Sequence, residues 1–308
     1  MQNKPIVLVA FGGNALIKKG QQGTASEQFV NLQLPMRQIA KLSRKYKIVI
    51  THGNGHQVGN LLLQQESCDE VPKMPLEIIG AQTQGQIGYM IESSLDTALM
   101  EIGIDDRYFV TIITYAVVDE NDPLFQNPSK PIGPSYTKEQ AAELTYNMVK
   151  TDKGYRRVVA SPKPVAIVEH REIKKLIEMD FIVICCGGGG IPVIRKERKF
   201  RGVEAVIDKD LASSVLAREI GADIFVIATD TTGAAIHWGQ PDQKILGKVP
   251  LAEMEQYVQE GHFPAGSMGP KVEALIEYFK ATDQRGIICN LEDIEKAIAG
   301  KAGTEIIK

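Results

Sequence analysis

Three lysines are the residues of this sequence best placed to hold an anion. Lys209 lies between Asp208 and Asp210, where a helix is expected to begin, and Lys271 lies at a second expected helix start. Lys130 stands in a loop whose neighbouring prolines stiffen the backbone. The N-terminus of a helix favours carboxylates over cations, so a lysine there is either exposed to solvent or directed at an anion that shares the site. The sequence alone leaves both readings open.

Glycine-rich turns provide a second type of anion-binding group. Short apolar segments run into three such turns, Gly12-Gly13-Asn14, Gly53-Asn54-Gly55 and Gly187-Gly188-Gly189-Gly190. Glycine lets backbone N–H groups approach a phosphate closely, and a following helix adds a partial positive charge. One such turn alone is more often a tight turn than a site. Several turns after successive strands favour a polyphosphate or carboxylate ligand.

These turns require a scaffold of alternating strands and helices. The strands expected at 4–10, 47–50, 181–186 and 224–228 are almost wholly apolar, as in a parallel sheet covered on both faces. Amphipathic or capped segments predict helices at 28–46, 84–102, 208–220, 270–280 and 291–299. This alternation predicts an α/β fold in which the strand ends meet in one ligand-binding crevice. Residues 117–164, rich in Pro, Asp, Asn and Lys, are expected to form an irregular protruding subdomain.

The composition fits a globular protein without a general footprint for nucleic acid or membrane. The chain has 308 residues, of which 44% are hydrophobic and 24% charged, and its formal net charge is -3. We see no spanning segment, signal peptide or lipidation motif, and expect a cytoplasmic protein that binds neither nucleic acid nor membrane. The four cysteines form no CxxC pair or zinc spacing, so no metal-ligating residues are predicted.

The motif census excludes several enzyme classes. The chain lacks GxxxxGK[ST], the protein-kinase motifs, GxSxG and HExxH. Residues 53–59 imitate a dinucleotide fingerprint, but the last glycine is one position too late and no acidic residue follows at the expected spacing.

The sequence resembles a known family, the carbamate kinases of the amino-acid kinase superfamily. The resemblance extends from about residue 7 to residue 307, and its most specific runs are GVEAVIDKDLAS and GSMGPKVEA. Further runs are AFGGNALI, QTQGQIGYMIE, NPSKPIGP, RRVVASPKP, CGGGGIPV and the terminal NLEDIEKAIAGKAGTEII.

The resemblance implies reversible phosphoryl transfer between ATP and carbamate, giving ADP and carbamoyl phosphate. It also implies that the reaction requires Mg²⁺ and runs toward ATP formation in catabolism. It implies one three-layer α/β/α sandwich over residues 1–308, with a mostly parallel open sheet. An N-terminal lobe, about 1–205, would hold carbamate and carry the protruding subdomain, about 117–164. A C-terminal lobe, about 206–308, would hold the nucleotide. The family is usually homodimeric, and arginine metabolism is one of its settings.

The resemblance also assigns roles residue by residue. Lys130 would reach the phosphoryl group from the subdomain, Lys209 would bridge to the phosphates, and Asp210 would orient the lysines. The nucleotide would contact Asp230, Met268 and Lys271, with Met268 at the base and Lys271 at the phosphates. The glycine-rich turns would hold the phosphoryl group and the carbamate, and Gly187 and Gly188 would lie on the floor of the crevice. The turn residues concerned are Gly12, Gly13, Asn14, Gly53, Asn54, Gly55, Gly187 and Gly188.

The chain departs from the family pattern at two places. His56 stands where HGNGPQVG has its proline, and residues 229–235 (TDTTGAA) replace a loop of the TDVDGVY type. The change at His56 leaves open a different phosphoryl acceptor, and the change at 229–235 leaves open a different packing of adenine. Neutral variation of these loops is the other reading. Two alternatives stay open: a paralogue that phosphorylates another carboxylate or carbamate-like acceptor, and a non-catalytic nucleotide-binding regulator.

Overall fold

An eight-stranded sheet forms the centre of the molecule in the computed structural model, which describes residues 4–152 and 154–308. All neighbouring strands run parallel except the antiparallel pair β16 and β17. The order is β15 (Lys248–Pro250), β17 (Thr304–Ile307), β16 (Arg285–Asn290), β12 (Ile224–Thr229), β1 (Ile6–Phe11), β2 (Lys47–His52), β9 (Ile182–Ile184) and β3 (Phe109–Thr111).

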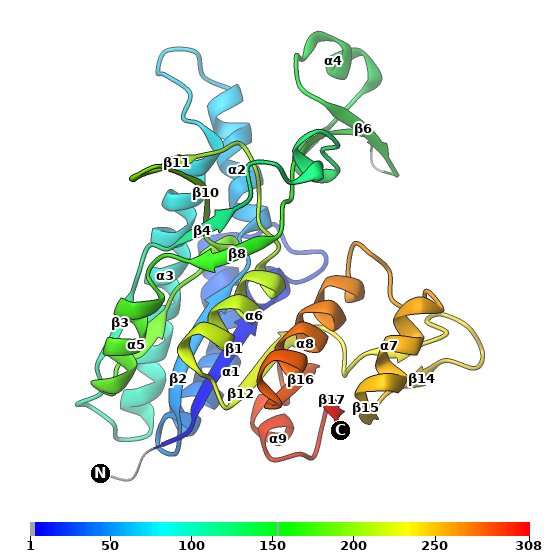
Figure 1. The fold of residues 1–308 in the computed structure, drawn as a ribbon. Helices are drawn as coiled ribbons and strands as arrows, with labels where there is room; N and C mark the ends of the chain where they lie inside the picture. Colours follow the sequence, from blue (N-terminus) through cyan, green and yellow to red (C-terminus); the bar gives the residue numbers. More distant parts are fainter. Residues whose placement is uncertain (1–3, 153) are drawn as a thin grey trace.

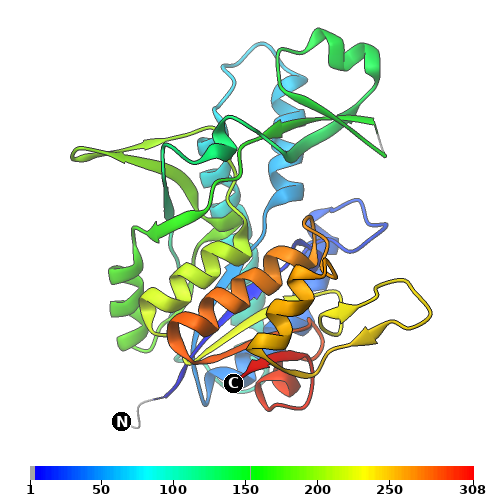
Figure 2. The same cartoon turned by 45° about the vertical axis from the view of Figure 1, so that its right-hand side comes forward.

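Helices cover both faces of this sheet, as Figures 1 and 2 show. One face packs on α1 (Ala25–Ser43), α3 (Leu76–Glu101) and α9 (Ile294–Ile298). The other packs on α5 (His170–Glu178), α6 (Lys209–Ile220), α7 (Leu251–Gln259) and α8 (Met268–Thr282). Successive side chains of a strand point to opposite faces, so Val7 and Val9 enter one core while Leu8 and Ala10 enter the other. This explains the apolar strands and confirms the predicted α/β/α sandwich with its mostly parallel sheet.

The four strands and five helices expected from the sequence are all present, with shifted ends. The helix expected at 84–102 begins eight residues earlier, at Leu76, and that at 270–280 begins at Met268, so Pro270 is its third residue rather than its first. The helix expected at 28–46 begins at Ala25, because Thr24 and Glu27 form a capping box ahead of it. Helix α6 is capped by Asp208 at its N-terminus and by Gly221, in the left-handed conformation, at its C-terminus.

The stretch expected to be irregular, 117–164, is more ordered than predicted. It contains an antiparallel sheet of β5 (Lys130–Tyr136), β7 (Gly154–Val159) and β6 (Met148–Thr151), together with α4 (Lys138–Glu143). Prolines and polar residues hid these strands, because strands outside a core need not be apolar. In Figures 1 and 2 this sheet and α4 stand away from the eight-stranded sheet. The division into two lobes and a subdomain stays a prediction.

Smaller elements complete the described chain. A four-stranded sheet has the order β11 (Lys199–Gly202), β10 (Ile191–Lys196), β4 (Tyr115–Val118) and β8 (Pro164–Ile167), and β13 (Ala235–Ile236) pairs with β14 (Lys244–Ile245). Helix α2 (Gly55–Glu66) follows β2, and three short 3₁₀ turns are η1 (Gly13–Ala15), η2 (Pro123–Phe125) and η3 (Gly187–Gly189). Within the described residues, no helix has the length and apolar character needed to cross a membrane.

Candidate active site

One cavity of about 540 Å³ brings together most of the residues that the sequence singled out. The turns after β1, β2 and β9 contribute to it, as do β5 and the first turns of α2, α6 and α8. Nine predicted residues line it: Gly13, Gly53, Asn54, Gly55, Lys130, Gly188, Lys209, Asp210 and Lys271. Several helices thus direct their N-terminal ends at this cavity, which favours an anionic ligand.

A buried carboxylate joins two of the three lysines. Lys209 Nζ lies 2.5 Å from Asp210 Oδ1, and Lys271 Nζ lies 3.1 Å from Asp210 Oδ2. The side chain of Asp210 is only 3% exposed, and those of Lys209 and Lys271 are 12% and 16% exposed. Since each oxygen carries one ammonium group, Asp210 fixes the separation of two cations that would otherwise repel each other.

A second carboxylate holds the third lysine. Asp208 is the N-cap of α6, and its Oδ1 accepts a hydrogen bond from Asp210 N at 3.0 Å. Its Oδ2 lies 3.2 Å from Lys130 Nζ on β5. The Lys130 side chain is 40% exposed, so this contact is weaker than the buried pairs and can exchange for a ligand. The start of α6 therefore organises lysines from three separate parts of the chain.

The pKa values of Lys209 and Asp210 both lie below their usual values. Burial lowers the pKa of Lys209, and the charge of Lys271 lowers it further, while Asp210 opposes both. Burial acts to raise the pKa of Asp210, but the two lysines outweigh it and hold that pKa below its usual value. Asp210 is therefore ionised at neutral pH. A phosphate in the cavity would favour the charged form of Lys209.

Close packing explains the first two of the four consecutive glycines, Gly187 and Gly188. A Cβ on Gly188, whose φ is +65°, would lie 2.1 Å from Asn54 Nδ2, and a Cβ on Gly187 would lie 2.6 Å from the His52 ring. Asn54 in turn donates to Thr83 Oγ1 at 2.9 Å. These glycines thus let the turn after β9 lie directly against the turn after β2.

His52 supports the turn as a neutral side chain. It is 2% exposed, and burial lowers its pKa to about 4. Its Nδ1 lies 3.1 Å from the carbonyl oxygen of Gly53, the geometry of an imidazole N–H donor. A neutral donor beside Lys209 adds no repulsion to the cluster.

Five predicted site residues do not line the cavity: Gly12, Asn14, Gly187, Asp230 and Met268. Gly12 donates its N–H to the carbonyl oxygen of Ala228 and so links β1 to β12. Asp230 is exposed after β12, and Met268 packs against the core beneath α8. Their nucleotide contacts stay predictions.

The two departures from the family pattern occupy different environments. His56 lines the cavity, and a Cβ on Gly13 would lie 3.7 Å from its Nδ1. In the loop after β12, Ala234 and Ala235 are buried and do not line the cavity. The change at His56 therefore bears on the site more directly.

Sequence reasoning missed two charged residues of the site. The sequence pattern assigns no site role to Asp208, which precedes Lys209, or to Arg156, which lies in the run RRVVASPKP. Both line the cavity. The signal for Arg156 was its place in a two-arginine run on an expected protrusion, but only the strand register shows which arginine faces inward.

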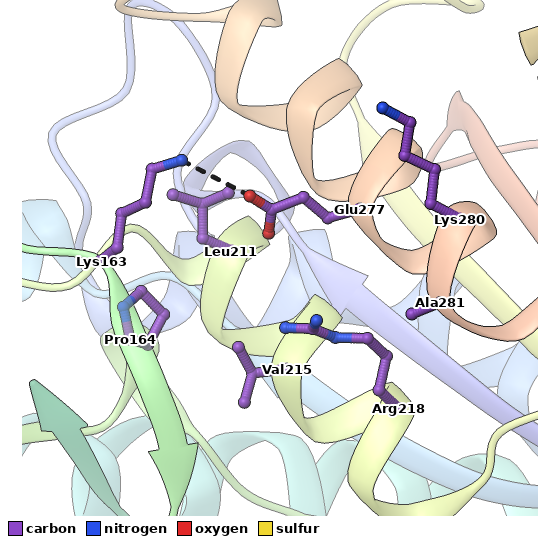
Figure 3. Close-up of a pocket in the computed structure, with 8 residues that line it drawn as sticks. All are labelled: Lys163, Pro164, Leu211, Val215, Arg218, Glu277, Lys280 and Ala281. Atoms are coloured by element: carbon purple, nitrogen blue, oxygen red, sulfur yellow. Dashed lines mark hydrogen bonds and ion pairs between the residues drawn. The ribbon is translucent and has the colours of Figure 1, made fainter.

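A separate hollow of about 510 Å³ lies between α6, α8 and the start of β8. Figure 3 shows Lys163 reaching toward Glu277 across it, above Leu211. None of the predicted site residues lines this hollow. Among its charged residues, Lys163 pairs with Glu277, and Lys280 pairs with Glu255 outside the hollow.

The described residues include no group of three or more His, Cys, Asp or Glu side chains that could hold a metal ion. Asp210 offers no free oxygen edge, because a lysine contacts each oxygen.

Comparison with known proteins points to one family. A family model described as the amino acid kinase family matches residues 5–290. The carbamate kinase of Thermococcus kodakarensis is 48% identical over 312 residues, covering 98% of this chain and 99% of that protein. The carbamate kinase of Haemophilus influenzae is 45% identical, covering 98% and 96%. The structure of a Giardia lamblia carbamate kinase bound to AMP-PNP superposes with a TM-score of 0.95 at 40% identity over 100% of both chains.

Proposed function

Because the chain belongs to the amino acid kinase family, we propose that it is a phosphotransferase that moves a phosphoryl group between ATP and carbamate. The products are ADP and carbamoyl phosphate, and the reaction is reversible. The observation that carries this proposal is the single cavity in which two carboxylates hold three lysines, two of them at helix starts and the third, Lys130, on β5. Its four cationic side chains exceed its two acidic ones, so it is built to receive anions.

The proposed chemistry requires no general base. The oxygen of carbamate is already anionic and can attack the γ-phosphate directly. The barrier lies in bringing two anions together and in stabilising the charge of the transferring group. Lys209 and Lys271, held by Asp210, would neutralise the nucleotide phosphates, and Lys130 would leave Asp208 to contact the transferring phosphoryl group.

The glycine turns would position the reactants. The N–H groups at Gly13 and around Gly53–Gly55 would bind the phosphoryl group and the carbamate, where side chains would block close approach. A Cβ on Gly53 would be in ordinary van der Waals contact with Lys209 Cδ, at 3.5 Å, so this turn lies directly beside Lys209. Fixing both reactants in this way removes much of the entropic barrier.

We further propose that Mg²⁺ accompanies the nucleotide, that the enzyme is cytoplasmic and homodimeric, and that it works toward ATP in a catabolic pathway such as arginine breakdown. A bound Mg²⁺ would neutralise phosphate charge. Light scattering tests the dimer, and activity after chelation and Mg²⁺ addition tests the metal.

The decisive experiment is a coupled assay of ATP formation from ADP and carbamoyl phosphate. ATP formation with carbamoyl phosphate, and much less with acetyl phosphate, supports the proposal. The second candidate function is phosphorylation of another small carboxylate or carbamate-like acceptor, and the observation that favours it is His56 at the cavity wall. Turnover restricted to a different acyl phosphate would favour that candidate. Nucleotide binding without any turnover would indicate a regulator and contradict both.

A further inference from the structure

Two adjacent arginines on β7 have opposite electrostatic surroundings. Arg157 Nη2 lies 2.5 Å from Glu204 Oε1, and its guanidinium stacks 4.0 Å from the centre of the Tyr146 ring. Successive residues of a strand point to opposite sides, so Arg156 points away from these partners and lines the 540 Å³ cavity. One arginine of the pair is therefore neutralised, and the other faces the site.

Arg156 makes no ion pair within the described part of the chain. Its Nη2 donates to the carbonyl oxygen of Gly133 at 2.9 Å and approaches that of Pro131 at 3.5 Å. Burial lowers the pKa of Arg156, although a guanidinium stays charged in proteins. A partly buried cation without a counter-charge is unfavourable unless an anion joins it.

No acid of the cavity is free to serve as that counter-charge. Asp210 is shared by two lysines, and Asp208 contacts Lys130. The guanidinium has N–H groups left after its bonds to the β5 carbonyls, in a planar fork that matches a carboxylate or phosphate. The strand to which Arg156 is bonded also carries Lys130 and packs on α2, whereas Lys271 comes from α8.

We propose that Arg156 is a substrate-binding residue for the acyl phosphate, which it contacts through a fork of two N–H groups while the nucleotide is held by Lys209 and Lys271. This inference rests on the proposed function and adds a residue to it. The carbonyl contacts to Gly133 and Pro131 fix the direction of the guanidinium, so little reorganisation accompanies binding.

The test compares Arg156→Ala and Arg156→Lys with Arg157→Ala as the matched control from the same strand. Loss of a charge-assisted pair of hydrogen bonds is expected to raise KM for carbamoyl phosphate about 10- to 100-fold in Arg156→Ala. KM for ADP is expected to stay within about twofold, because the proposed nucleotide contacts, Lys209 and Lys271, come from α6 and α8 rather than from β7. Arg156→Lys keeps the charge but not the fork and should recover only a small part. Arg157→Ala should leave KM for carbamoyl phosphate within about twofold.

A purely structural role for Arg156 would act by bracing β5 and hence Lys130. In that case Arg156→Ala would add nothing in a Lys130→Ala background, whereas direct contact predicts a further rise in KM for carbamoyl phosphate. Added methylguanidine should lower that KM in Arg156→Ala only if the guanidinium touches substrate. An unchanged KM in Arg156→Ala, or an equal rise for both substrates without methylguanidine rescue, would overturn the inference. Wild-type protein that forms no ATP would instead overturn the proposed function.

Discussion

Removing the charge of Asp210 is the most informative single change in this site. Asp210→Asn keeps the size of the side chain but leaves two partly buried ammonium groups without their shared counter-charge. Breaking a buried ion pair on one side typically costs about 3–5 kcal/mol. Both lysines keep 12–16% exposure, so we expect a loss of about 2–4 kcal/mol in the free energy of unfolding.

Activity should change in two ways. Misplaced lysines no longer match the transferring charge, so kcat should fall about 10²- to 10³-fold. Asp210 raises the pKa of Lys209, so its removal lowers that pKa further and shifts the alkaline limb of the pH–activity profile to lower pH. Denaturant unfolding followed by circular dichroism gives the first quantity, and ATP formation between pH 6 and 10 gives the others.

A compensating variant separates stability from catalysis. In Asp210→Asn combined with Lys271→Met, one unpaired cation is removed together with its partner, so much of the lost stability should return. Activity should not return, because the phosphate contact is also gone. An Asp210→Asn protein as stable as the wild type, with an unmoved alkaline limb, would refute this account of the cluster.

Three further predictions concern other parts of the site. Lys130→Ala should lower kcat by about 10²–10³ or more while the melting temperature changes little, because this lysine is 40% exposed; a near-normal kcat would contradict its role. Gly188→Ala should lower the free energy of unfolding by more than about 2 kcal/mol and weaken carbamoyl phosphate binding, since the methyl group meets Asn54; a Gly221→Ala control, with positive φ but open space, isolates the clash. Burial lowers the pKa of His52 to about 4 in the folded protein, against an ordinary value of 6.5. Between these two pH values the unfolded chain binds more protons than the folded protein, so the free energy of unfolding rises with pH. His52→Gln should remove about 3 kcal/mol of this pH dependence, which would appear as a flatter plot of unfolding free energy against pH.

Much of the scaffold could be predicted because its signals are local. Apolar strands, glycine turns and the caps of α6 are written in short runs, and parallel strand ends must share one edge of the sheet. The strand order, including β12 between β1 and β16, depends on pairings between distant residues that no local run encodes. The β5-β7-β6 sheet was missed because β5 contains two prolines and the short strands β6 and β7 lack a continuous apolar pattern.

The candidate site was predictable only in part for a similar reason. Lys209 and Asp210 are neighbours in the sequence, so their pairing could be expected from the sequence alone. The contact of Lys130 with Asp208 joins residues far apart in the sequence and could not. Arg156 and Arg157 are indistinguishable by type, and only the direction of each side chain separates them. Met268 comes from a shared motif and does not line the cavity, so its contact with the nucleotide stays a prediction.

The pairing of β1 with β12 has a consequence for synthesis of the chain. Val7 lies opposite Ile224, so one edge of the first strand stays open until most of the polypeptide has left the ribosome. An unpaired apolar edge of this kind is a template for wrong association. Nascent chains halted before residue 224 should therefore depend on chaperones, and completion of β12 should release them.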